Sequence, residues 1–125
     1  MKYGIVGNRE GWTYTFIKRI LQELDITHED TLISGGCEGV DTHAQTYAKE
    51  TGCTIIIMYP KPHEPSPDRY FNRNKEIAET SDVLIAFDKG SSKGSGTLNT
   101  INHARRAGKK VIIFKNENEF KNVTE

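Results

Sequence analysis

The segment ISGGCEGVD, residues 33–41, decides the fold of this chain. It begins as a short apolar strand, continues through a glycine turn and ends on an acidic residue that opens a helix. Glycines remove side chains where a ligand approaches the backbone, and a helix start presents free N–H groups with a partial positive charge. Taken alone, the segment is equally typical of a tight turn. A second glycine loop, KGSSKGSGT at residues 89–97, also lies between an apolar run and a helix, which favours an anion-binding site.

Size and composition narrow the class of protein. The chain has 125 residues, which predicts one domain whose core needs no disulfide or metal. Its two cysteines are too few for a disulfide framework and favour a reducing compartment. No apolar run approaches the roughly 20 residues that span a bilayer, so we expect a cytoplasmic protein without a membrane partner. The 17 basic and 17 acidic residues cancel, which weighs against nucleic acid as a partner and leaves room for a local cationic pocket.

Strand and helix patterns alternate on both sides of this segment. Amphipathic spacing predicts four helices, the first capped by Thr13 and the second closed by Gly52. The third is expected to start with Ser66 as its cap and Pro67 in its first helical position. The run CTIIIMY at residues 53–59 is continuous and β-branched, as in a parallel strand covered on both faces. Apolar runs predict strands at residues 2–6, 31–34, 53–59, 82–87 and 110–114.

Five strands alternating with four helices predict an α/β fold. We expect a single-domain, Rossmann-like, doubly wound parallel sheet of five strands in the order 3-2-1-4-5. It should occupy residues 1–114, followed by a polar tail at residues 115–125. The strand order reverses between the first and fourth strands, and ligands bind at such a reversal, beyond the carboxyl ends of the strands. The loops at residues 7–9, 34–41 and 90–97 all follow strands and therefore converge on one site.

The chemistry of these loops suits a phosphate. Backbone N–H groups at residues 94–97 and the neighbouring hydroxyls can donate to phosphate oxygens. Arginines can add bidentate contacts or a plane that stacks on a base. Asp41 either accepts hydrogen bonds from a ribose or stabilises its own helix N-terminus. The residues expected at the ligand are Gly7, Asn8, Arg9, Ser34, Gly35, Gly36, Gly39, Asp41, Arg69, Asn72, Arg73, Asn74, Ser92, Lys93, Gly94, Ser95, Gly96 and Thr97.

Other site chemistries find less support in the sequence. Neither glycine loop has the spacing of a P-loop or of a dinucleotide fingerprint. Cys37 has no histidine at the spacing of a catalytic triad and is expected to be a small packing residue. The four histidines are scattered, so we expect neither a metal site nor a bound cofactor. Trp12 either packs over a base or covers the first helix.

With these motifs in order, the chain resembles the SLOG superfamily. This Rossmann-like group includes the LOG phosphoribohydrolases and the DprA proteins of DNA uptake, and the chain is most similar to its stand-alone YspA-like branch. The resemblance covers about residues 2–114 and implies a nucleotide or nucleotide-derived ligand and, often, a homo-oligomer. It rests on Gly7-Asn8-Arg9, SGGCEGVDTHA from Ser34, Asn72-Arg73-Asn74, Ser81-Asp82 and SSKGSGT from Ser91.

The resemblance does not by itself determine an activity. LOG enzymes carry PGGxGTxxE with a catalytic final glutamate, and Thr100 stands at that place here. A carboxylate is required there to stabilise a ribosyl cation or to activate water, so hydrolysis would depend on Glu38 or Asp41. We therefore expect a sensor or a sequestering protein for a phosphorylated nucleoside derivative, such as an ADP-ribose-type or cyclic nucleotide signal. The alternatives are an N-glycosidic phosphoribohydrolase acting on a nucleoside monophosphate, DprA-like binding of single-stranded DNA, and a purely structural or protein-binding domain.

Overall fold

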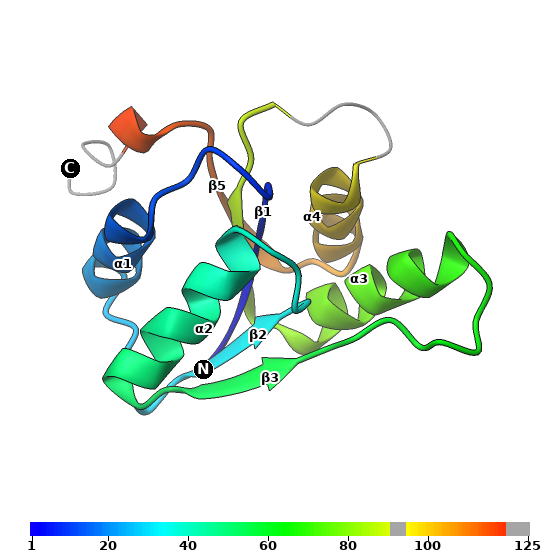
Figure 1. Ribbon diagram of the computed structural model, residues 1–125, viewed down its shortest axis with the longest axis horizontal. Helices are drawn as coiled ribbons and strands as arrows, with labels where there is room; N and C mark the ends of the chain where they lie inside the picture. Colours follow the sequence, from blue (N-terminus) through cyan, green and yellow to red (C-terminus); the bar gives the residue numbers. More distant parts are fainter. Residues whose placement is uncertain (91–94, 120–125) are drawn as a thin grey trace.

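A computed structural model describes residues 1–90 and 95–119 of the chain. In these residues, strands and helices alternate along the chain, and no helix is both long enough and apolar enough to cross a membrane (Figure 1). The strands are β1 (Lys2–Gly7), β2 (Thr31–Ser34), β3 (Thr54–Ile57), β4 (Val83–Phe87) and β5 (Lys110–Phe114). The helices are α1 (Tyr14–Glu23), α2 (Val40–Thr51), α3 (Asp68–Thr80), α4 (Gly96–Arg106) and the short 3₁₀ helix η1 (Glu117–Glu119).

The sheet is parallel and doubly wound. Its strands lie in the order β3-β2-β1-β4-β5, which confirms the order predicted from the sequence. Successive residues of a strand face opposite sides, so Ile5 packs in the core covered by α1 and α2, whereas Val6 packs in the core covered by α3 and α4. Figure 1 shows the two helix pairs on opposite sides of the sheet. Because a pair of helices lies on each side of the central strands, the strand ends are where a ligand can reach the middle of the sheet.

The first two helices begin and end where local signals predicted. The Thr13 hydroxyl accepts the backbone N–H of Phe16 at 3.2 Å and so caps α1. Helix α2 ends at Gly52, which has the left-handed φ of 81°. Trp12 is buried, with ring centroids 5.6 Å from Phe16 and 5.4 Å from Phe87. Trp12 therefore covers α1, and the alternative of a contact with a base is wrong.

Strand β3 is shorter and more exposed than its sequence predicts. The apolar run at residues 53–59 predicts a strand covered on both faces, but β3 spans only Thr54–Ile57, and Ile56 is 38% exposed. The strand lies at the edge of the sheet and pairs only with β2. Ile55 packs on the core covered by α1 and α2, whereas α3 packs mainly against α4 and over β1. The prediction of two covered faces is therefore wrong for this strand.

The start of α3 also differs from its prediction. The sequence predicts Ser66 as the cap and Pro67 as the first helical residue, but α3 begins at Asp68 without a side-chain cap. The Ser66–Pro67 peptide is cis. Backbone carbonyls take the place of the serine, since the N–H of Arg69 donates to the Pro65 carbonyl at 3.0 Å. The predicted serine cap is therefore wrong, because the preceding loop itself satisfies the first helical N–H groups.

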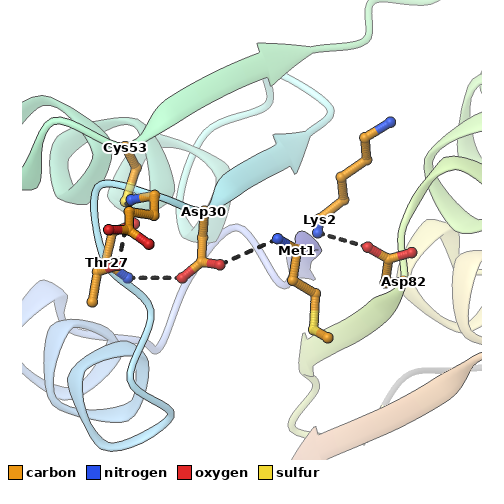
Figure 2. A network of polar contacts seen from close by, with 7 residues as sticks. Met1, Lys2, Thr27, Asp30, Cys53 and Asp82 are labelled. Atoms are coloured by element: carbon orange, nitrogen blue, oxygen red, sulfur yellow. Dashed lines mark hydrogen bonds and ion pairs between the residues drawn. The ribbon is translucent and has the colours of Figure 1, made fainter.

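Polar contacts at the amino ends of the strands hold β1 between its neighbours (Figure 2). The backbone N–H of Lys2 donates to Asp82 at 2.8 Å, just before β4. The Met1 amino group lies 3.3 Å from Asp30, just before β2. Asp30 also accepts the backbone N–H of Thr27 at 2.9 Å. Asp82 and Asp30 therefore tie the start of β1 to the segments that precede β4 and β2.

Part of the predicted tail packs on the domain. The Glu117 carboxylate accepts the Thr13 backbone N–H at 2.9 Å and the Thr13 hydroxyl at 2.7 Å. These hydrogen bonds lower the pKa of Glu117 below its ordinary value. The chain after β5 is thus tied to the amino terminus of α1.

Candidate functional site

A cavity of about 460 Å³ opens at the carboxyl end of the sheet. It lies beyond β1 and β2, against the amino-terminal parts of α3 and α4, where the strand order reverses. Ligands of doubly wound sheets bind at this point. The volume lies within the range of small-molecule sites, about 300–1,000 Å³.

Arg73 supplies positive charge to the cavity. Its Nη1 donates to the Gly35 carbonyl at 2.7 Å, and its Nε donates to Asn74 Oδ1 at 2.9 Å. Nη2 lies 3.9 Å from the Cys37 thiol. Among the residues that the structure describes, no carboxylate lies within 4.0 Å of the guanidinium. Neutral acceptors therefore hold the guanidinium in place and leave its charge available to an anion.

The amino terminus of α4 meets the same cavity. The Ser95 hydroxyl caps this helix by accepting the Leu98 N–H at 3.1 Å. The N–H groups of Gly96 and Thr97 have no acceptor within the helix, and both residues line the cavity. A helix N-terminus carries a partial charge of about +0.5. Arg73 and α4 thus present two positive features to one cavity.

Asp41 braces the glycine loop from within. Its carboxylate is buried, lines the cavity and accepts the Cys37 N–H at 3.0 Å. Burial raises the pKa of Asp41 above its ordinary value, and the hydrogen bond from Cys37 and the charge of Arg73 oppose that rise. The Ser34 hydroxyl also lowers the pKa of Asp41. The oxygen of this hydroxyl is buried and has no hydrogen-bond partner of ordinary length among the described residues. Asp41 therefore holds the glycine loop through the Cys37 N–H and also lines the cavity.

Two glycines allow the loops around the cavity to approach each other. Gly39 has a φ of 82°, and a Cβ there would lie 2.2 Å from the Arg9 carbonyl oxygen. A Cβ on Gly35 would lie 2.7 Å from Arg73 Nη1 and 3.3 Å from Asp41 Oδ2. Gly39 is therefore glycine where the Arg9 backbone passes close by, and Gly35 is glycine where the side chains of Arg73 and Asp41 meet the loop.

Asn8 joins the loops that follow β1 and β4. Its Oδ1 accepts the Lys89 backbone N–H at 2.8 Å and the Trp12 indole N–H at 3.2 Å. Its Nδ2 donates to Asp88 at 3.4 Å. Both ends of the amide are engaged, so Asn8 lines the cavity as a structural residue.

The asparagines on either side of Arg73 have different surroundings. Asn74 is 5% exposed, accepts from Arg73 and donates to the Gly96 carbonyl at 3.4 Å. It therefore links Arg73 to the amino terminus of α4. Asn72 is exposed and donates to Glu64 at 2.8 Å, away from the cavity.

The structure brings only part of the predicted residue set together. The predicted residues that line the cavity are Gly7, Asn8, Arg9, Gly35, Asp41, Arg73, Asn74, Gly96 and Thr97. The described residues that were predicted at the ligand or as catalytic and do not line the cavity are Ser34, Gly36, Glu38, Gly39, Arg69, Asn72 and Ser95. The predicted residues Ser92, Lys93 and Gly94 lie outside the described residues.

One side of the cavity is apolar, and the sequence patterns did not assign it to the site. Most of it comes from α3 and the residue before it, where lining positions recur every three or four residues. This helical spacing, on the same helix as Arg73, is the sequence signal that would have predicted these apolar lining residues. Cys37 lines the cavity rather than only packing, and the Thr100 hydroxyl donates to the Gly96 carbonyl at 2.9 Å. The additional lining residues are Val6, Cys37, Pro67, Tyr70, Phe71, Ile77 and Thr100.

Two solved structures share this fold. DNA processing protein A (DprA) from Streptococcus pneumoniae is 21% identical, with a TM-score of 0.74 over 90% of this chain. DprA from Helicobacter pylori, described for its single-stranded DNA binding mode, is 20% identical, with a TM-score of 0.71 over 90% of this chain. The chain spans 49% and 64% of these two proteins. At such identities the likeness is one of fold. No curated protein matches the sequence.

The family assignment rests on the sequence of almost the whole chain. The family model of SLOG cluster4 matches residues 4–125. This range includes the glycine loop, α3 and α4, which form the cavity, and it confirms the superfamily expected from the motifs. The chain therefore belongs to the SLOG cluster4 family.

Proposed function

We propose that the cavity binds a nucleotide or nucleotide-derived ligand through a phosphate held between Arg73 and the amino terminus of α4. One observation carries the proposal. The Arg73 guanidinium is fixed by neutral oxygen acceptors, has no carboxylate within 4.0 Å among the described residues, and shares the cavity with Gly96 and Thr97. Hydrogen bonds between a guanidinium and a phosphate are about twice as strong as neutral ones.

The remaining surfaces of the cavity suit the other parts of a nucleotide. Asp41 offers a carboxylate that can accept from ribose hydroxyls, and the apolar side can cover a base. Membership of the SLOG cluster4 family and the likeness in fold to DprA support a nucleotide or nucleic-acid ligand. Bound without chemical change, such a ligand would be sensed or sequestered by the protein.

A panel of ligands tests the proposal directly. Thermal unfolding of the protein is measured with AMP, ADP-ribose, NAD and cyclic di- and trinucleotides, and each mixture is then analysed by mass spectrometry. A ligand at 100 times its Kd stabilises the folded state by about 2.7 kcal/mol, which is a large shift for a domain of this size. At least one member of the panel should raise the Tm and be recovered intact. A flat response to the whole panel would overturn the proposal.

Two substitutions locate the phosphate. Arg73→Gln removes the charge, and Gly96→Ala adds a methyl group at the start of α4. Among the described residues, the nearest atom outside the helix and its chain neighbours is Asn74 Nδ2 at 3.7 Å. That distance is an ordinary contact, so Gly96→Ala should leave the ligand-free Tm unchanged or higher and weaken binding. Arg105→Gln, an exposed change at the other end of α4, is the matched control. Equal affinity in all three variants would place the ligand elsewhere.

Asp41 favours a second candidate function. A buried carboxyl that lines the cavity, with its pKa raised by burial, suits a general acid that protonates a leaving base. The corresponding activity is N-glycosidic hydrolysis of a nucleoside monophosphate. Release of a free base from AMP, lost in Asp41→Asn while AMP binding persists, would support it. No base release at high protein concentration would rule it out.

DprA-like binding of single-stranded DNA is the third candidate. The Helicobacter pylori protein binds single-stranded DNA, which is at odds with the expectation that nucleic acid is not a partner of this chain. The balanced charge of the chain still weighs against a broad nucleic-acid surface. Fluorescence anisotropy of a labelled oligonucleotide tests for a DNA-binding surface, because such a surface gives an affinity that falls steeply with salt concentration. Competition of the oligonucleotide by AMP would show that both use the cavity.

A further inference from the structure

We propose that Tyr70 is the platform on which the base of the ligand stacks, so that the cavity recognises a base by its flat surface and not by its edges. This inference rests on the nucleotide-binding function proposed above. It adds a residue and a rule of selectivity that neither the motifs nor the family assignment supplies.

The exposure of Tyr70 is the first observation. Among the described residues, the large hydrophobic side chains that remain exposed are Met1, Ile56, Tyr59 and Tyr70. Tyr70 is 44% exposed and is the member of this group that lines the cavity. An aromatic ring held at the wall of a cavity, with much of its surface uncovered, offers apolar area to a flat partner.

The spacing between Tyr70 and Arg73 is the second observation. The two residues are three apart on α3, so they lie on the same face of the helix, about 4.5 Å apart along its axis. Both line the cavity. In a nucleotide, a ribose separates the phosphate from the base by a comparable span. A phosphate at Arg73 therefore brings the base to Tyr70.

The surroundings of Tyr70 are the third observation. Its neighbours in the cavity wall, Pro67 and Phe71, carry no polar side-chain atom. The Arg69 guanidinium lies 5.4 Å from the ring centroid, a cation–π distance that helps to hold the ring in place. Arg69 does not line the cavity, and the side chains of Pro67 and Phe71 beside Tyr70 offer no donor or acceptor to the edge of a base.

The amide side chains elsewhere in the cavity are also occupied. Asn8 bonds to Trp12 and Lys89, and Asn74 bonds to Arg73 and Gly96. Stacking tolerates every base because each has a π face. The cavity should therefore prefer purines, which have the larger face, over pyrimidines, and distinguish poorly between adenine and guanine.

The experiment combines a substitution with a truncated ligand. Calorimetry measures the binding of AMP, GMP, CMP and ribose 5-phosphate, which lacks a base, to the full chain and to Tyr70→Ala. Loss of base stacking costs about 1–3 kcal/mol, so Tyr70→Ala should weaken AMP binding roughly 5- to 150-fold. Ribose 5-phosphate should bind the variant as it binds the original protein. Tyr70→Phe should retain AMP affinity, because the ring remains.

Controls make the outcomes distinct. Tyr59→Ala removes a tyrosine that is 66% exposed and does not line the cavity, and it should change neither AMP nor ribose 5-phosphate binding. Equal losses for AMP and ribose 5-phosphate in Tyr70→Ala, or a marked preference between AMP and GMP, would overturn the stacking role alone. Binding of neither AMP nor ribose 5-phosphate to the original protein, with no response to the wider nucleotide panel, would instead overturn the proposed function. A Tm of Tyr70→Ala equal to that of the original protein shows that folding is intact.

Discussion

The Nη1 atom of Arg73 lies 2.7 Å from the carbonyl oxygen of Gly35, and it would lie equally close, at 2.7 Å, to a Cβ built on that glycine. A side chain at residue 35 would therefore displace the guanidinium of the α3 arginine from the loop after β2. This contact joins α3, which contributes the positive charge of Arg73, to the glycine loop after β2, which forms part of the cavity wall.

Gly35→Ala should therefore weaken ligand binding more than it lowers stability. The added methyl group would overlap the end of the Arg73 side chain and crowd Asp41. Because the end of an arginine side chain can shift, we expect the guanidinium to move and the free energy of unfolding to fall by less than the about 1–3 kcal/mol of rigid overpacking. Titration with AMP measures the displacement of Arg73, and urea unfolding measures the loss of stability. Gly96→Ala, whose Cβ has its nearest neighbour among the described residues at 3.7 Å, is the control for the stability measurement alone, because it should itself weaken binding. A Gly35→Ala variant that binds AMP as tightly as the original protein would contradict the displacement of Arg73.

Asn8→Ala should destabilise the protein by about 1–3 kcal/mol. The substitution leaves the Trp12 indole N–H and the Lys89 backbone N–H without their acceptor. Because Trp12 is the single tryptophan of the chain, its fluorescence spectrum reports the change directly. Asn72→Ala, an exposed change that breaks only the hydrogen bond to Glu64, serves as the control and should be nearly neutral. An unchanged Trp12 spectrum in Asn8→Ala would show that Asn8 does not hold the ring.

Asp41→Asn should become more stable relative to the original protein as the pH rises. Burial raises the folded-state pKa of Asp41 above its unfolded value, so its contribution to stability is present in acid and is lost as the pH rises through the folded pKa. The Tm of the variant minus the Tm of the original should therefore increase as the pH rises above the ordinary aspartate pKa of about 3.9. Asp68→Asn, an exposed change at the start of α3, is the control. A constant difference for Asp41→Asn as the pH rises would contradict the raised pKa.

Glu117→Gln should show the opposite dependence on pH. Hydrogen bonds from Thr13 lower the folded-state pKa of Glu117, so its contribution is present above the unfolded pKa and is lost as the pH falls through the folded pKa. The variant should melt at a lower temperature than the original at neutral pH, and the two Tm values should converge in acid. Glu23→Gln, an exposed change near the end of α1, is the control. Parallel pH profiles for Glu117→Gln and the original protein would show that the contact with Thr13 adds no stability.

The pattern of apolar residues determined the fold without help from the structure. The conformation of each helix and strand depends mainly on residues close in sequence. Signals within the same segment, such as the Thr13 cap and Gly52, mark where helices begin and end. Strands joined by helices pair in parallel with right-handed crossovers, which leaves few possible orders of the sheet. The order in turn determines where the loops meet, so the glycine segment at residues 33–41 predicted the place of the cavity as well as the fold.

Only the tertiary structure decided which side chains remain available to a ligand. The Asn8 amide is occupied by a residue 80 positions away, and the Asn74 amide by one 22 positions away. The docking of Glu117 on Thr13 spans 104 positions, and the exposure of Ile56 follows from the place of α3 over the sheet. A local pattern encodes the conformation of its own segment. Hydrogen-bond partners and exposure depend on distances between segments, which exist only once the chain has folded.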